Sequence, residues 1–216
     1  MQITIREPGS AITHFIGMMM ALFASVPLLV KAGVSSGGKH FIAMAIFMAS
    51  MILLYGASTA YHSVTLTGKY LRIFRKLDHI MIFVLIAGSY TPVCLIVLGG
   101  DLGYTLLALV WGIALAGILL KAVWITCPKW VSSIIYIAMG WVCVLVFGQL
   151  FDTLSAAAFL WLLAGGIIYT IGGVVYALKL PIFNSRHKEF GSHEIFHLFV
   201  MAGSVCHFIF MYSYVA

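Results

Sequence analysis

The stretch TLSAAAFLWLLAGGIIYTIGGVVYAL, residues 153–178, contains no charged side chain and is longer than the about 20 residues that a helix needs to cross a bilayer. Charged side chains are expensive at the centre of a membrane, so the intervals between them indicate which segments can span it. Six further uncharged windows are long enough: 8–30, 40–68, 79–100, 102–120, 130–151 and 195–216. The sequence therefore predicts an all-α, polytopic bundle of seven transmembrane helices.

The limits of these helices follow from the polar residues that flank them. The weakest boundary lies between the third and fourth helices, where only the turn-type sequence Gly-Gly-Asp-Leu-Gly, residues 99–103, supplies a break. A bundle of six helices therefore stays open as an alternative. No stretch resembles a linker, so we expect residues 1–216 to form one membrane domain. The expected helices are approximately 11–30, 41–62, 79–99, 103–121, 131–150, 156–178 and 194–214.

The composition excludes a soluble protein. The chain is 63% hydrophobic and 8% charged, whereas soluble domains are about half apolar and about a quarter charged. The net charge of +6 comes from few residues in the predicted loops, so membrane topology explains it and we expect no nucleic-acid partner. No CxxC pair is present, which argues against a disulfide framework and a thiolate metal site. We interpret all four cysteines as reduced packing residues: Cys94, Cys127, Cys143 and Cys206.

The basic residues predict the orientation of the bundle. Numbering the loops alternately places ten of the twelve Lys and Arg residues on one side of the membrane, with Lys31 and Lys39 opposite. Because loops rich in Lys and Arg stay in the cytoplasm, we expect a cytoplasmic amino terminus and an outside carboxyl terminus. The ten residues are Arg6, Lys69, Arg72, Arg75, Lys76, Lys121, Lys129, Lys179, Arg186 and Lys188.

Helices of alternating direction bring polar residues that are distant in sequence to the same depth. Odd-numbered helices start at the cytoplasmic side and even-numbered helices end there, so one leaflet receives the ionisable groups of several helices. These groups are Glu7 and His14 in the first helix, Ser58 and His62 in the second, Asp78 and His79 in the third, and His193, Glu194 and His197 in the seventh.

Three of these residues predict a zinc site. His193 and His197 are four residues apart, so both imidazoles lie on one helix face about one turn apart. His62 can supply a third nitrogen, and three neutral imidazoles suit zinc. Ser58 lies one turn from His62 on the same face, where it can form a supporting hydrogen bond. Asp78 can hold and deprotonate a zinc-bound water, whose pKa the metal lowers toward about 7.

Simpler interpretations stay open for each residue. An H-x-x-x-H pair alone is weak evidence of a metal, and His62 near an interface can snorkel or form a hydrogen bond between helices. Asp78 can cap the third helix, because Asp favours helix starts. Ser58 can be a small packing residue between helices.

Two further patterns compete with this site. HEIFH, residues 193–197, also fits the H-E-x-x-H motif of zincin proteases, with Glu194 as the general base. Glu7 and His14 are two helical turns apart, which predicts a mutual contact or an anchor for the helix start. His207 lies fourteen residues after His193, about 21 Å along the helix, so it cannot share the zinc site.

Six motifs together carry a family resemblance: EPGSAITH (7–14), STAYH (58–62), KLDH (76–79), GSYTP (88–92), HEIFH (193–197) and GSVCHF (203–208). With these motifs the chain resembles the bacterial hemolysin III family, within the wider progestin and adipoQ receptor superfamily, whose membrane-hydrolase pattern is similar to that of the alkaline ceramidases. The resemblance covers nearly the whole chain. One departure is visible, because relatives usually carry Asn in the first motif, where this chain has Gly9 and Ser10.

The resemblance implies a seven-helix protein of the bacterial inner membrane. It implies zinc bound by His62, His193 and His197, with Ser58 and Asp78 as supporting residues. It leaves several functions open. The first is a zinc-dependent hydrolase of lipid amide or ester bonds, with membrane lipid as substrate; the second is a membrane-homeostasis or sensor protein with structural zinc. A haemolytic protein and a transporter are weaker alternatives, because so apolar a chain has no soluble form and offers few polar residues in the outer leaflet.

Overall fold

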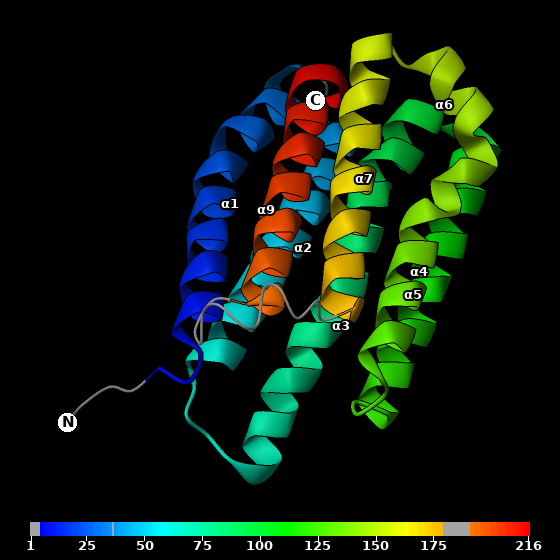
Figure 1. The fold of residues 1–216 in the computed structure, drawn as a ribbon. Helices are drawn as coiled ribbons and strands as arrows, with labels where there is room; N and C mark the ends of the chain where they lie inside the picture. The colour runs from blue at the N-terminus through cyan, green and yellow to red at the C-terminus, as the bar shows by residue number, and fades with distance from the viewer. Residues whose placement is uncertain (1–4, 36, 179–190) are drawn as a thin grey trace.

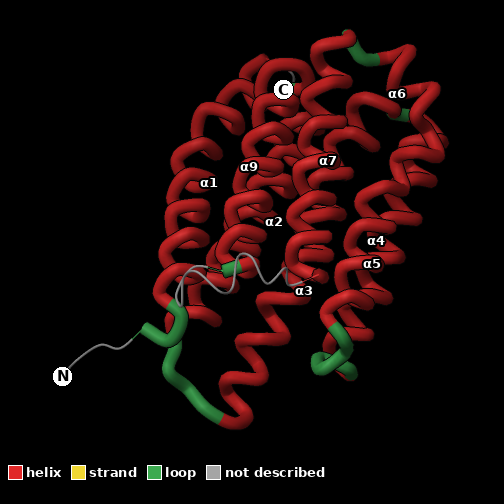
Figure 2. Tube along the Cα trace, viewed as in Figure 1, coloured by secondary structure: helices red, strands yellow, loops and turns green. Residues whose placement is uncertain are grey.

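The computed structural model describes residues 5–35, 37–178 and 191–216, and every regular element within them is a helix (Figures 1 and 2). Seven helices are long and apolar enough to cross a membrane, which confirms the prediction of an all-α bundle with seven spans. The α-helices are α1 (Pro8–Ser35), α2 (Gly38–Ser63), α3 (Gly68–Pro92), α4 (Gly100–Val123), α5 (Lys129–Gly140), α6 (Phe147–Thr153), α7 (Ala156–Leu178) and α9 (Ser192–Phe210).

Several of the spans are not uniform α-helices. The third continues past Pro92 as a π-helix, Val93–Leu98, and α9 ends in another, Met211–Val215. The fifth span consists of α5, a 3-10 segment, Trp141–Val146, and α6. Pro at the end of α3 lacks the N–H that an α-helix needs, which is a common cause of such local rewinding.

A tight glycine turn separates the third and fourth spans. Gly99 and Gly100 have φ angles of 60° and 52°, in the left-handed region that glycine enters without a steric penalty. This turn reverses the chain between α3 and α4, so the six-helix alternative is wrong.

The helices close into a ring. In sequence order α1, α2, α3 and α4 each pack against the next, α5 packs against α7, and α9 packs against both α7 and α1 (Figure 1). The approach of α7 and α9 depends on small residues. A Cβ added at Gly172 would lie 2.6 Å from the Cβ of Phe199, and one added at Gly203 would lie 2.7 Å from the ring of Tyr169. Small residues allow backbones to approach this closely where helices meet in a membrane.

Helix α3 starts at Gly68, well before the range 79–99 expected from the sequence. Its first turns carry Lys69, Arg72, Arg75 and Lys76 and extend beyond the neighbouring helices at the end of the bundle where the amino terminus lies (Figure 1). Helix α3 therefore includes charged residues that lie outside the lipid. We call this end of the bundle the basic end; Lys179, Arg186 and Lys188, also assigned to it, lie outside the described residues.

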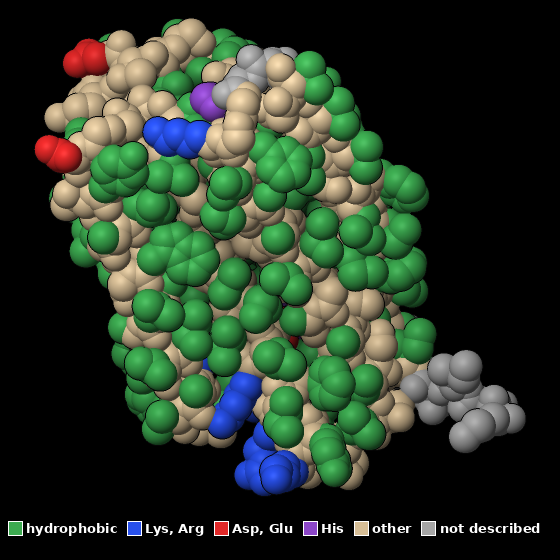
Figure 3. Space-filling model, turned by 180° about the vertical axis from the view of Figure 1, so that it is seen from behind, with side chains coloured by type: hydrophobic (Ala, Val, Ile, Leu, Met, Phe, Trp, Pro, Cys, Tyr) green, Lys and Arg blue, Asp and Glu red, His purple; other side chains and the backbone are tan. Residues whose placement is uncertain are grey.

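The lateral surface is apolar. Large hydrophobic side chains such as Phe23, Leu119 and Leu145 are 66–72% exposed, and hydrophobic side chains cover the middle of the face in Figure 3. Most Lys and Arg side chains of that face lie near one end, and Asp and Glu, with a Lys or Arg beside a histidine, lie near the other (Figure 3). Such a wide apolar belt is the surface that a bilayer solvates.

Candidate metal centre and cavity

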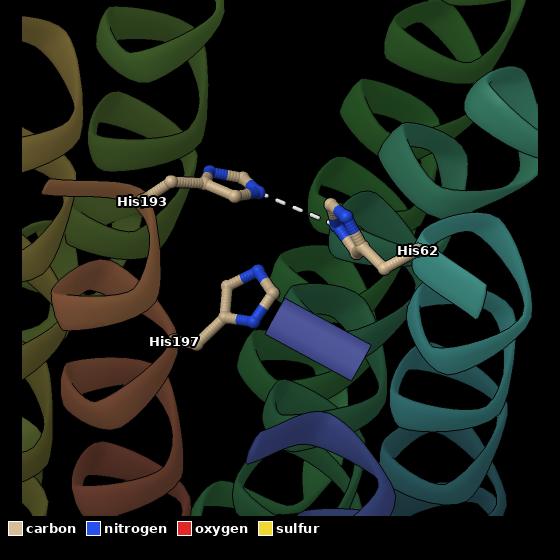
Figure 4. A group of neighbouring side chains, drawn as sticks. All are labelled: His62, His193 and His197. Carbon is tan, nitrogen blue, oxygen red and sulfur yellow. Dashed lines mark hydrogen bonds between the residues drawn. The ribbon is translucent and has the colours of Figure 1, made fainter. Parts of the chain in front are cut away.

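Three histidines converge at the basic end of the ring. His62 lies in the last turn of α2, and His193 and His197 lie in the first two turns of α9 (Figure 4). One nitrogen of each lies within 4.8 Å of the others, and Nε2 of His62 is 3.3 Å from Nε2 of His193. Two nitrogens bound to one tetrahedral zinc at about 2.0–2.1 Å must lie about 3.3 Å apart, so this spacing fits zinc.

Glu7 fixes the ring of His62. Nδ1 of His62 donates a hydrogen bond to the Glu7 carboxylate, and the Glu7 main-chain N–H donates to the carbonyl oxygen of His62 at 3.0 Å. The hydrogen bond from His62 lowers the pKa of Glu7 to about 2; burial opposes this shift, and the charge of Arg6 adds to it. With Nδ1 protonated and held, Nε2 of His62 presents its lone pair toward the other histidines.

Thr13 has the same role for His197. The Thr13 hydroxyl is 3.0 Å from the carbonyl oxygens of Gly9 and Ser10, to which it donates, and 3.1 Å from Nδ1 of His197. Because the hydroxyl has only one proton, Nδ1–H of His197 must be the donor to Thr13. His197 is therefore left with the lone pair of Nε2 for a metal.

The carboxylate of Glu194 faces away from this centre. Ser10 Oγ donates to it at 2.5 Å, and the main-chain N–H of Gly191 donates to it at 2.8 Å. Glu194 thus accepts a main-chain hydrogen bond at the start of α9 and links α9 to α1 through Ser10. The zincin interpretation of HEIFH needs this carboxylate as a base, so the geometry disfavours it.

Asp78 and Ser58 lie on the wall of one cavity together with His193 and His197. Both side chains are buried; Asp78 Oδ2 is 3.4 Å from Nδ1 of His79, and Ser58 lies close enough to interact with the Asp78 carboxylate. Thr67, not Asp78, precedes the first residue of α3. Asp78 is therefore in the third turn, and the helix-cap interpretation is wrong.

His14 lies beside the centre. It does not contact Glu7, although one interpretation of the sequence expected that contact. The His14 ring is 3% exposed and stacks on His197, with centroids 3.5 Å apart and planes 7° apart. Neither of its ring nitrogens has a hydrogen-bond partner among the described residues. The expected pairing is wrong because Glu7 precedes α1, which starts at Pro8, and so does not share a helix face with His14.

The cavity has a volume of about 170 Å³ and runs from the histidines into the apolar interior. Ser58, Asp78 and the two histidines of α9 contribute polar groups to its lining, and most of the remaining wall is hydrocarbon and aromatic. His207 lines the cavity too but is not one of the residues that could hold the metal, as the sequence predicted. Representative apolar lining residues are Leu54, Ile82, Leu85, Phe147, Leu150 and Leu162.

Sequence reasoning missed the roles of Ser10 and Thr13. Both lie on the first turns of α1 and reach α9, and only the packing of α1 against α9 reveals their partners. A weak signal was present, because Glu7, Ser10 and Thr13 recur every three residues just before and within a helix start.

Comparison with known proteins agrees with this architecture. Hemolysin-3 of Bacillus cereus is 37% identical over 214 residues, which is 99% of this chain and 94% of the relative. The Hemolysin-3 homolog of Bacillus subtilis (strain 168) is 39% identical over 95% of this chain and 92% of its own length. The adiponectin receptor protein of Drosophila melanogaster is 26% identical over 94% of this chain and 49% of its own.

Residues 2–208 match the family described as haemolysin-III related, which is nearly the whole chain. Its bacterial relatives and its seven apolar helices make it a multi-pass bacterial membrane protein. The order of the helices, the histidines at the basic end and the similarity over the full length lead to one assignment: this chain belongs to the haemolysin-III related family.

Proposed function

We propose that this protein is a zinc-dependent membrane hydrolase that cleaves an amide or ester bond of a lipid. The observation that carries the proposal is a cluster of three histidines, two of which, His193 and His197, line a mainly apolar cavity together with one buried carboxylate and one buried hydroxyl. Metal-binding polar groups in the wall of a mainly apolar cavity match an amphiphile with a reactive carbonyl near its headgroup.

His62, His193 and His197 would hold the zinc through one nitrogen each. Three protein ligands leave a position for water, which is the arrangement of catalytic rather than structural zinc sites. A bound zinc ion supplies a Lewis acid for a carbonyl oxygen and a water molecule that is acidic enough to lose a proton near neutral pH.

Asp78 is the general base in this proposal, and later the donor of the same proton to the leaving amine or alkoxide. Its carboxylate is buried on the cavity wall, so a proton passed to it stays inside the site. His79 contacts the carboxylate at 3.4 Å and orients it, and Ser58 supplies a hydroxyl beside it. The acyl chain would lie along Leu85 and Leu150, where little polar surface has to be desolvated.

Two other functions compete with hydrolysis. The zinc can be structural, in a membrane-homeostasis or sensor protein, because its ligands join α2 to α9 across the ring. The name Hemolysin-3 of two relatives favours a haemolytic activity. In the hydrolase proposal, haemolysis follows from a disturbed lipid composition rather than from a secreted toxin.

The test begins with zinc stoichiometry in purified protein. We expect about one zinc per chain in the wild type and in His40→Ala, a histidine in the first turn of α2 at the other end of the bundle, and none in the triple variant His62→Ala, His193→Ala, His197→Ala. Zinc in the triple variant would contradict the site.

The second measurement is release of fatty acid from ceramide and from phospholipid in mixed micelles. Asp78→Asn should keep its zinc and lose about 10²–10⁴-fold in rate, because it removes only the base. No hydrolysis by zinc-loaded wild type, on any amide or ester lipid, would leave the structural role as the better account.

A further inference from the structure

A second polar cluster lies away from the histidines, at the junction of α4 and α5. Lys121 is in the last turn of α4, Cys127 is in the connection, and Ser132 is in the first turn of α5. Nζ of Lys121 donates to Ser132 Oγ at 2.5 Å and to Cys127 Sγ at 2.9 Å, and the sulfur is 3.2 Å from Ser132 Oγ. The three groups therefore contact one another in a closed triangle.

Lys121 is a buried cation, with a residue exposure of 1%. An ammonium group removed from water is stable only beside an anion or a full set of acceptors. In the part of the chain that the structure describes, its hydrogen bonds go only to Cys127 and Ser132. Of these two groups only the thiol ionises readily, so the cluster favours a thiolate at Cys127.

The surroundings of Cys127 also favour its thiolate form. Burial raises the pKa of the thiol, but hydrogen bonds from Lys121 and Ser132 and the charges of Lys121 and Arg75 outweigh burial, so the pKa is lower than its ordinary value. Cys127 lies between the spans that end at Val123 and start at Lys129, and it is 6% exposed. The exposed part of Cys127 therefore lies outside the spans, where a small water-soluble oxidant is present.

We propose that Cys127 is a peroxide-reactive thiolate, activated by Lys121, and that it is an oxidation site distinct from the metal centre. The thiolate sulfur attacks one oxygen of hydrogen peroxide and forms an S–O bond. The O–O bond breaks, and the departing hydroxide takes a proton from the Lys121 ammonium to become water. The sulfur is oxidised to a sulfenic acid, the peroxide is reduced, and Lys121 is left as a neutral amine.

The other cysteines provide an internal comparison. Cys94 is 0% and Cys206 is 8% exposed, and both lie within membrane spans. Cys143 also lies within a span, Lys129–Thr153; it is more exposed than Cys127, but its thiol is a neutral donor to the carbonyl oxygen of Gly140 at 3.6 Å. Exposure alone therefore predicts that Cys143 reacts first, whereas the ammonium–thiolate pair predicts Cys127.

The experiment treats the purified, zinc-loaded full chain in detergent with hydrogen peroxide, traps sulfenic acid with dimedone, and follows each cysteine by peptide mass spectrometry. We expect Cys127 to be labelled about tenfold faster than Cys143 or any other cysteine. Lys121→Met, which keeps the length but removes the charge, should lower the rate at Cys127 by about tenfold, and Lys31→Met should not change it.

Two results would overturn the proposal: labelling of Cys143 before Cys127 in the wild type, and an unchanged rate at Cys127 in a Lys121→Met variant that is monodisperse. If Lys121→Met does not fold, the ranking of the four cysteines in the wild type decides alone. Zinc content and lipid hydrolysis are separate readouts, so this result is independent of the proposed function.

Discussion

His62 and His197 each hold Nδ1 against a residue near the start of α1, so the nitrogens proposed to bind zinc are oriented by groups outside the proposed ligand set. Such outer partners fix the tautomer and the orientation of an imidazole. Glu7 and Thr13 contribute these contacts from one short segment, in which Ser10 bonds to Glu194 instead. The affinity of the centre should therefore depend on residues that never contact the metal.

This dependence can be measured in Glu7→Ala. Loss of the acceptor for His62 Nδ1–H should weaken zinc binding by about 10–100-fold in a competition titration with a chelator. Glu194→Ala is the matched control, because its carboxylate bonds to Ser10 and Gly191 and not to a ligand histidine. Equal affinity in Glu7→Ala and wild type would show that His62 needs no such support.

At the scale of helices, the proposed zinc is a cross-link between α2 and α9, which are far apart in the sequence. A ligand that binds only the folded state stabilises it by an amount that grows with the logarithm of the free ligand concentration relative to its Kd. Chelation should therefore lower the melting temperature of the wild type in detergent. His197→Ala should melt low already and should not respond to the chelator; a full response would place the metal elsewhere.

The contact of α7 with α9 offers a test with a matched pair of glycines. Gly172→Ala places a methyl group 2.6 Å from the Cβ of Phe199, whereas Gly166, on the same helix, has nothing within 4 Å of the added Cβ. Overpacking of this kind costs about 1–3 kcal/mol. Gly172→Ala should therefore unfold at lower denaturant or temperature than Gly166→Ala, and the reverse order would contradict the packing described here.

Charge placement alone was sufficient to predict the number and order of the spanning helices, because lipid excludes charge wherever it occurs in the sequence. The same rule could not place the start of α3, since a helix can continue through Lys69 and Arg72 once it leaves the bilayer. The common depth of His62, His193 and His197 follows from the alternating direction of the helices. Their lateral approach and the contacts of Thr13 and Glu7 do not, because they depend on how the helices pack around the ring and how α1 is rotated against its neighbours.

For the molecule as a whole, the predicted orientation places the basic end in the cytoplasm. Asp152 is exposed at the other end, after an odd number of crossings from Lys69. In cells with a permeabilised outer envelope, a membrane-impermeant maleimide should label Asp152→Cys at once and Lys69→Cys only after lysis. The labelled position is identified by mass spectrometry; labelling in the opposite order would invert the topology.

The ring closes only when α9 reaches α1 and α7, and α9 comes after the other six described spans in chain order. Before α9 is in place, His62 lacks the two histidines of α9, and the segment that includes Ser10 and Thr13 lacks its hydrogen bonds to α9. Binding of the proposed zinc would therefore require that α9 is already in place. A nascent or truncated chain without α9 lacks two of the three histidines that would hold the metal.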